Sequence, residues 1–69
     1  MFDEEKFRQV IKEKNVTLQE IADMLDINLV TLYRKMSGES DFYRNEIETI
    51  KNNLNIDNAL EIFFANKIA

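Results

Sequence analysis

The stretch 17–38, TLQEIADMLDINLVTLYRKMSG, decides the fold of this 69-residue chain. Thr17 and Glu20 have the spacing of a capping box. In this motif the first residue's hydroxyl accepts a hydrogen bond from a backbone N–H in the first turn, and the second residue's carboxylate accepts one from the backbone N–H of the first. Apolar residues then follow at helical spacing: Leu18, Ile21, Ala22 and Leu25. The next three residues, 26–28, suit a turn, because Asp and Asn side chains bond nearby backbone N–H groups. The stretch therefore predicts a short helix followed by a tight turn.

A second short helix is expected after this turn. Asn28 is placed to cap it, and Leu32 and Met36 are spaced to face inward. Gly38 can end the helix in the left-handed conformation. Ala22 supplies a small side chain where the two helices must approach each other. Residues 17–38 are therefore predicted to form a helix-turn-helix unit.

This unit resembles the Cro/repressor helix-turn-helix family of bacterial and phage regulators. The matching residues are Thr17, Glu20, Ile21, Ala22, Leu25, Ile27, Thr31, Leu32, Arg34 and Gly38. The resemblance covers most of the chain and points to the small regulators of temperate-phage genetic switches. It implies a lambda-repressor-like bundle, a transcription regulator of the lysis–lysogeny decision, and the bacterial cytoplasm as its location.

The rest of the chain predicts three more helices and a single all-α domain over 1–69, a bundle of about five short helices. Proline is absent and glycine occurs once, which leaves few signals for hairpins. The first helix is expected near 4–14 with Asp3 as its cap, and the fourth over 44–53. Asp57 is expected to cap a short fifth helix that carries Phe63 and Phe64.

Two pairs of adjacent aromatic residues leave alternatives open. Phe63 and Phe64 cannot both face one direction from a helix. One is expected in the core, and the other either completes that core or contacts a second copy of the chain. Phe42 and Tyr43 either pack at the start of the fourth helix or belong to a partner surface.

The composition argues against an enzyme. Histidine and cysteine are absent, which removes the commonest general base and the soft metal ligands. The acidic residues at 3–5 and the pair Glu46 and Glu48 are interpreted as solvated helix-end charges. No cofactor, metal or small-molecule substrate is expected. No apolar run approaches the roughly 20 residues that span a bilayer, so no membrane partner is expected either.

Operator DNA is the partner that the resemblance implies. In such modules the second helix of the unit enters the major groove, and its first turns reach base edges. The candidate DNA-binding residues are Asn28, Thr31, Tyr33, Arg34, Lys35 and, beyond the next loop, Arg44. Arg34 can bond guanine bidentately or hold a phosphate. The alternative for Arg34 and Lys35 is ordinary solvated surface, and for Tyr33 it is partial packing.

Two features favour a protein partner instead. The chain carries a formal charge of −4, whereas DNA-binding domains normally present a basic surface. The family often has polar residues, commonly Gln, where this chain has Leu18 and Leu29, and Val30 follows. These apolar side chains cannot make bidentate base contacts. Separately, Asp26 stands where the family commonly has Gly; this departure is interpreted as tolerated, although it puts a carboxylate near the path of a phosphate backbone.

The alternative function is that of an antirepressor, which binds the DNA-binding domain of a phage repressor and blocks its operator binding. The candidate protein-binding residues are Leu18, Asp26, Leu29, Val30 and Tyr33. Acidic side chains such as Glu20 and Asp23 would meet basic residues of the repressor. Leu18 and Leu29 can equally pack together across the turn, so the sequence leaves their exposure open.

Overall fold

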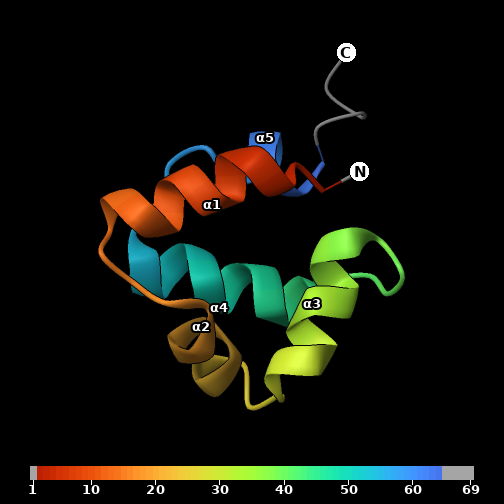
Figure 1. The fold of residues 1–69 in the computed structure, drawn as a ribbon. Helices are drawn as coiled ribbons and strands as arrows, with labels where there is room; N and C mark the ends of the chain where they lie inside the picture. The colour runs from red at the N-terminus through yellow and green to blue at the C-terminus, as the bar shows by residue number, and fades with distance from the viewer. Residues whose placement is uncertain (1, 65–69) are drawn as a thin grey trace.

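The computed structural model describes residues 2–64, in which it places five α-helices and no strand (Figure 1). The helices are α1 (Glu4–Glu13), α2 (Leu18–Met24), α3 (Leu29–Ser37), α4 (Arg44–Leu54) and α5 (Ala59–Phe63). This arrangement confirms the prediction of a small all-α bundle. No helix within 2–64 has both the length and the apolar character that crossing a membrane requires.

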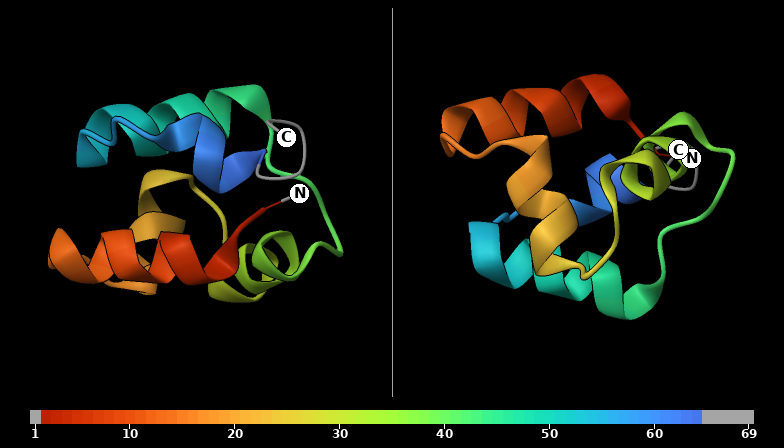
Figure 2. Two further views of the ribbon diagram at one scale, coloured as in Figure 1. Left: turned by 90° about the horizontal axis from the view of Figure 1, so that it is seen from above. Right: turned by 60° about the horizontal axis from the view of Figure 1, so that its bottom comes forward.

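The central helix of the bundle is α4, which packs against both α2 and α5 (Figures 1 and 2). The short α5 also packs against α1, and α2 packs against α3. Ile21 and Ala22 of α2 and Leu32 of α3 are fully buried. The small side chain of Ala22 therefore lets the two helices of the unit approach closely, as the sequence predicts.

The predicted caps at the starts of α1, α2 and α3 are confirmed at atomic detail. Asp3 Oδ1 accepts from the Lys6 N–H at 3.0 Å. The Thr17 hydroxyl accepts from the Glu20 N–H at 3.1 Å, and Glu20 Oε1 accepts from the Thr17 N–H at 2.9 Å, which completes the capping box. Asn28 Oδ1 accepts from the Thr31 N–H at 2.7 Å. Each bond satisfies a donor that the first turn of a helix leaves without a partner.

The first four helices share one way of ending. A residue with positive φ follows or closes each of them: Asn15, Asp26, Gly38 and Asn55. After three of these positions the next N–H bonds a carbonyl five residues back, from Val16 to Ile11, Ile27 to Ala22 and Ile56 to Lys51. This is the Schellman pattern, in which an apolar residue after the left-handed one packs back on the helix. Asp26 thus adopts the left-handed conformation in the turn between α2 and α3.

The hydrophobic core shows where the two pairs of adjacent aromatic residues lie. Phe63 is buried, whereas Phe64 is half-buried and packs against the core cluster. Phe2 lies against Phe42 and Phe63, with ring centroids 4.9 and 5.3 Å apart, so the N-terminal segment is tied to the loop before α4 and to α5. Phe42 is therefore part of this aromatic cluster, while Tyr43 is exposed.

Two helix boundaries differ from the predictions in a way that has a physical cause. Asn58 occupies the N-cap position of α5, so the prediction that Asp57 caps this helix is wrong. No side chain caps α5; instead the Asn58 carbonyl accepts from the N–H groups of Glu61 and Ile62, at 3.1 and 3.3 Å. Helix α4 continues to Leu54, past the expected end at residue 53, because Leu54 is buried in the core.

Replacing Gly38 with Ala tests the helix ending at α3. The φ of Gly38 is +90°, and an added Cβ would meet no atom within 4 Å, so the penalty comes from the backbone alone. We expect Gly38→Ala to lower the free energy of unfolding by about 1–2 kcal/mol in urea denaturation followed by circular dichroism. Asn55→Gly is the control, because Asn55 has a φ of 55° that glycine accepts without strain. A neutral Gly38→Ala would contradict this account.

Candidate functional site

The exposed face of α3 is the candidate functional site. Val30, Tyr33 and Arg34 stand at i, i+3 and i+4 and therefore share one face of the helix. Val30 is 58% exposed and Tyr33 is 45% exposed, and Arg34 is exposed beside them. Leu32 and Met36 point to the opposite side and are buried. An aliphatic, an aromatic and a guanidinium group are thus presented together to solvent.

Two further predicted DNA contacts flank this face. Asn28 is exposed, but its side-chain oxygen already accepts from the Thr31 N–H as the helix cap. Thr31 is half-buried. The amide nitrogen of Asn28 is the group that this cap leaves available for a bond to DNA or protein.

Lys35 does not belong to the exposed face, so the expectation of a solvated DNA contact at this position is wrong. The residue is only 4% exposed. Its Nζ lies 3.0 Å from Glu46 Oε1, donates to the Asp41 backbone carbonyl at 2.9 Å, and sits 4.1 Å from the centre of the Tyr43 ring. Lys35 follows Leu32 by three residues, which places it on the inward side of α3.

Glu46 is the partner that sequence reasoning missed. It was expected among solvated helix-end charges, but it is 7% exposed and paired with Lys35. Its Oε1 also accepts from the Tyr43 N–H at 2.8 Å, at the start of α4. The three-residue spacing between Tyr43 and Glu46 is the local signal that could have indicated this bond. Nothing in the local sequence indicates that Lys35 would meet it.

The structure separates the predicted apolar anchors into two groups. Leu18 and Leu29 are half-buried and pack against the hydrophobic core. Val30 remains largely exposed. Asp26 is exposed in the turn between α2 and α3. Of the predicted apolar anchors, Val30 and Tyr33 are therefore the ones that a partner can reach.

The exposed charges of the helix-turn-helix unit are mostly negative. Within 17–38 the exposed charged side chains are Glu20, Asp23 and Asp26 against Arg34, because Lys35 is buried. The Arg34 Nε lies 3.9 Å from Glu39 Oε2. Arg44, at the start of α4, is exposed and lies 3.7 Å from Glu48 in an ion pair. Both arginines can leave these exposed pairs at little cost, since such pairs contribute about 0–1 kcal/mol.

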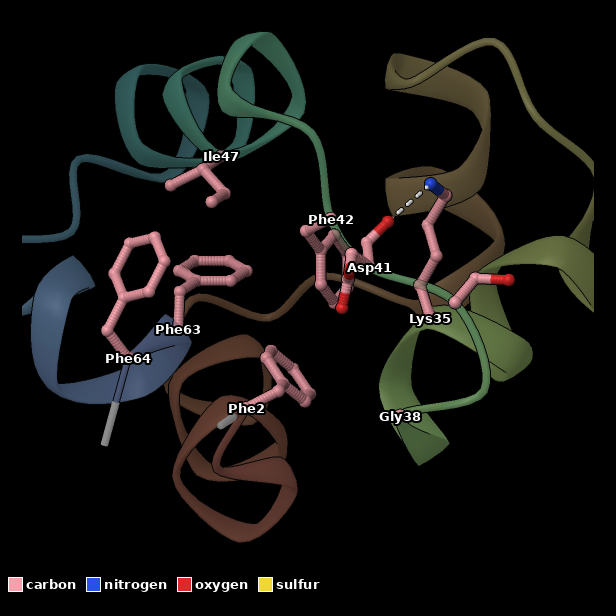
Figure 3. Close-up of a pocket in the computed structure, with 9 residues that line it drawn as sticks. Phe2, Lys35, Gly38, Asp41, Phe42, Ile47, Phe63 and Phe64 are labelled. Atoms are coloured by element: carbon pink, nitrogen blue, oxygen red, sulfur yellow. Dashed lines mark hydrogen bonds between the residues drawn. The ribbon is translucent and has the colours of Figure 1, made fainter. Parts of the chain in front are cut away.

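A pocket of about 480 Å³ lies between Phe2, the loop after α3, and α5 (Figure 3). Phe2, Phe42, Phe63 and Phe64 line it, and the Lys35 ammonium is bonded to the Asp41 carbonyl (Figure 3).

No buried side-chain nitrogen or oxygen within 2–64 lacks a hydrogen-bond partner. Across the same residues no group of three or more acidic side chains is placed to hold a metal ion.

Comparison with known proteins adds no relative: no family model, curated protein or solved structure matches this chain.

Removing the Lys35 side chain tests the buried pair. Lys35→Ala leaves the Glu46 carboxylate buried without its cation, and breaking a buried pair in this way costs about 3–5 kcal/mol. We therefore expect a large fall in the urea midpoint. Lys6→Ala is the matched control, because Lys6 forms an exposed pair with Glu61 at 3.7 Å and its loss should cost less than about 1 kcal/mol. Equal effects of the two substitutions would show that Lys35 is not buried against Glu46.

Proposed function

We propose that this chain is a small helix-turn-helix transcription regulator of a phage-type genetic switch, which binds operator DNA through the exposed face of α3. The observation that carries the proposal is the position of this face. Val30, Tyr33 and Arg34 lie together on the helix that directly follows the capped turn. The resemblance to Cro/repressor regulators supports the same use of this helix. The role is one of binding rather than catalysis, in the bacterial cytoplasm.

The contacts follow from the chemistry of the exposed groups. Arg34 bonds a guanine edge or a phosphate, and Asn28 offers its amide nitrogen. The Val30 side chain contacts a thymine methyl group, and the Tyr33 hydroxyl bonds a phosphate. Arg44 adds a phosphate contact from the start of α4. With two arginines at the proposed interface and an acidic body, a single copy binds DNA weakly, so two copies on symmetric half-sites are expected.

A second candidate function is favoured by one specific observation. With Lys35 buried, α3 presents one cation beside two large apolar side chains, and exposed carboxylates lie on α2 and in the turn. This combination suits a basic protein surface such as the DNA-binding face of a phage repressor. In this role the chain is an antirepressor, with Val30 and Tyr33 as anchors and Asp26 as a charged neighbour.

Fluorescence anisotropy separates the two functions. Labelled DNA from the flanks of the chain's own gene is titrated at about 50 and 200 mM salt, with and without the repressor encoded beside it. Sequence-specific, salt-sensitive binding by the chain alone supports operator binding. No binding alone, together with release of the bound repressor, supports the antirepressor. If the chain neither binds the DNA nor releases the repressor, both proposed functions are refuted.

Arg34→Ala tests the DNA contact. We expect the affinity for the specific site to fall by about tenfold or more, and the salt slope to decrease by about one if the guanidinium holds a phosphate. Arg8→Ala on α1 removes the same charge from an exposed residue of another helix and serves as the control. Equal affinities for these two variants would count against α3 as the DNA-binding helix.

Val30→Asp tests the protein contact. A carboxylate at the centre of an apolar anchor should abolish release of the repressor from DNA, because truncating or charging such an anchor costs about 2 kcal/mol or more. Leu60→Asp makes the same chemical change at an exposed position on α5. The antirepressor account would be wrong if both variants, each shown to be folded by circular dichroism, released the repressor as the unaltered chain does.

A further inference from the structure

A single lysine connects the helix of the functional face to the start of α4. Lys35 lies in the last turn of α3, and its Nζ reaches Glu46, the Asp41 carbonyl and the Tyr43 ring. Among the described residues, the side-chain hydrogen bonds and ion pairs between α3 and 41–46 all come from Lys35. Figure 3 shows the bond from Lys35 to Asp41 in the loop that joins the two helices.

The other end of this contact is itself fixed to the backbone. Glu46 Oε1 accepts both the Lys35 ammonium, at 3.0 Å, and the Tyr43 N–H, at 2.8 Å. One carboxylate oxygen therefore joins the last turn of α3 to the first turn of α4. Rotation of α3 about its axis, or its movement along α4, breaks a charge-assisted bond in a buried site, where an unpaired charge is costly.

The residues beside this contact are the exposed cations of the proposed interface. Arg34 precedes Lys35 in α3, and Arg44 lies two residues before Glu46 in α4. Both guanidinium groups are exposed. Contacts from two helices to one DNA site require a defined distance and angle between those helices, since phosphate contacts set the register in which bases are read.

We infer that Lys35 is a positioning residue, which holds the face of α3 in a fixed orientation relative to Arg44 and touches no partner itself. The role of Lys35 in recognition rests on the proposed function, whereas the fixed orientation of α3 is a property of the chain alone. Lys35 thus serves recognition through Arg34 and Arg44, although its charge is withdrawn from the surface.

The double variant Lys35→Met/Glu46→Gln tests the inference. It removes the charge pair together while keeping similar side-chain volumes, and the Gln oxygen still accepts from the Tyr43 N–H. Lys6→Met/Glu61→Gln makes the same two changes in an exposed pair between α1 and α5. If the buried double variant does not fold, Glu46→Gln alone replaces it, because it weakens the same pairing and keeps the capping bond.

The first readout needs no partner. Residual dipolar couplings of the ¹⁵N-labelled chain report the orientation of each helix. In the buried double variant we expect the couplings of α3 to deviate from the alignment frame that fits α1, α4 and α5, or to shrink through added motion. In the control, all helices should fit one frame. A buried variant whose α3 fits the unaltered frame overturns the inference.

The second readout is affinity, measured by anisotropy on DNA from the flanks of the gene under conditions where circular dichroism shows both variants folded. We expect the ratio of specific to non-specific affinity to fall about tenfold in the buried variant and to stay unchanged in the control. Unchanged ratios in both variants overturn the role in recognition. If the unaltered chain binds no DNA, the proposed DNA function fails, and the dipolar couplings alone decide the positioning role.

Discussion

The buried ion pair between Lys35 and Glu46 is the interaction on which the charge of the exposed α3 face depends. Charges leave water only where partners offset the loss of hydration. Here the ammonium has a carboxylate, a carbonyl and an aromatic ring, and the carboxylate has a second donor in the Tyr43 N–H. The pair therefore links α3 to α4 in one geometry and removes a cation from the surface of α3.

This removal changes the character of the α3 face. A helix with Arg34 and Lys35 side by side would offer two cations to a phosphate backbone, but only Arg34 is exposed. The apolar side chains of Val30 and Tyr33 then make up a larger share of the face, and α2 carries exposed carboxylates. The two proposed functions, operator binding and repressor binding, would therefore use the same residues of α3.

Local signals predicted the helices because each signal acts within a few residues. The caps at Asp3, Thr17 and Asn28 need only a side chain and an N–H three residues away. The predicted left-handed ending at Gly38 needs only the absence of a Cβ. The boundary at α5 was misjudged because that helix has no side-chain cap and begins where its apolar residues meet the core.

The sequence by itself determined the all-α class, the helix-turn-helix unit and the inward residues Leu32 and Met36, because periodicity and capping are short-range properties of the chain. Only the tertiary structure decided that Lys35 and Glu46 are buried and that Leu29 is half-buried. Their burial depends on which residues distant in sequence meet them in space, and a charged residue enters a core only when that meeting supplies its partner. The position of α3 in the fold was therefore predictable, whereas packing settled which charged and apolar side chains its exposed face presents.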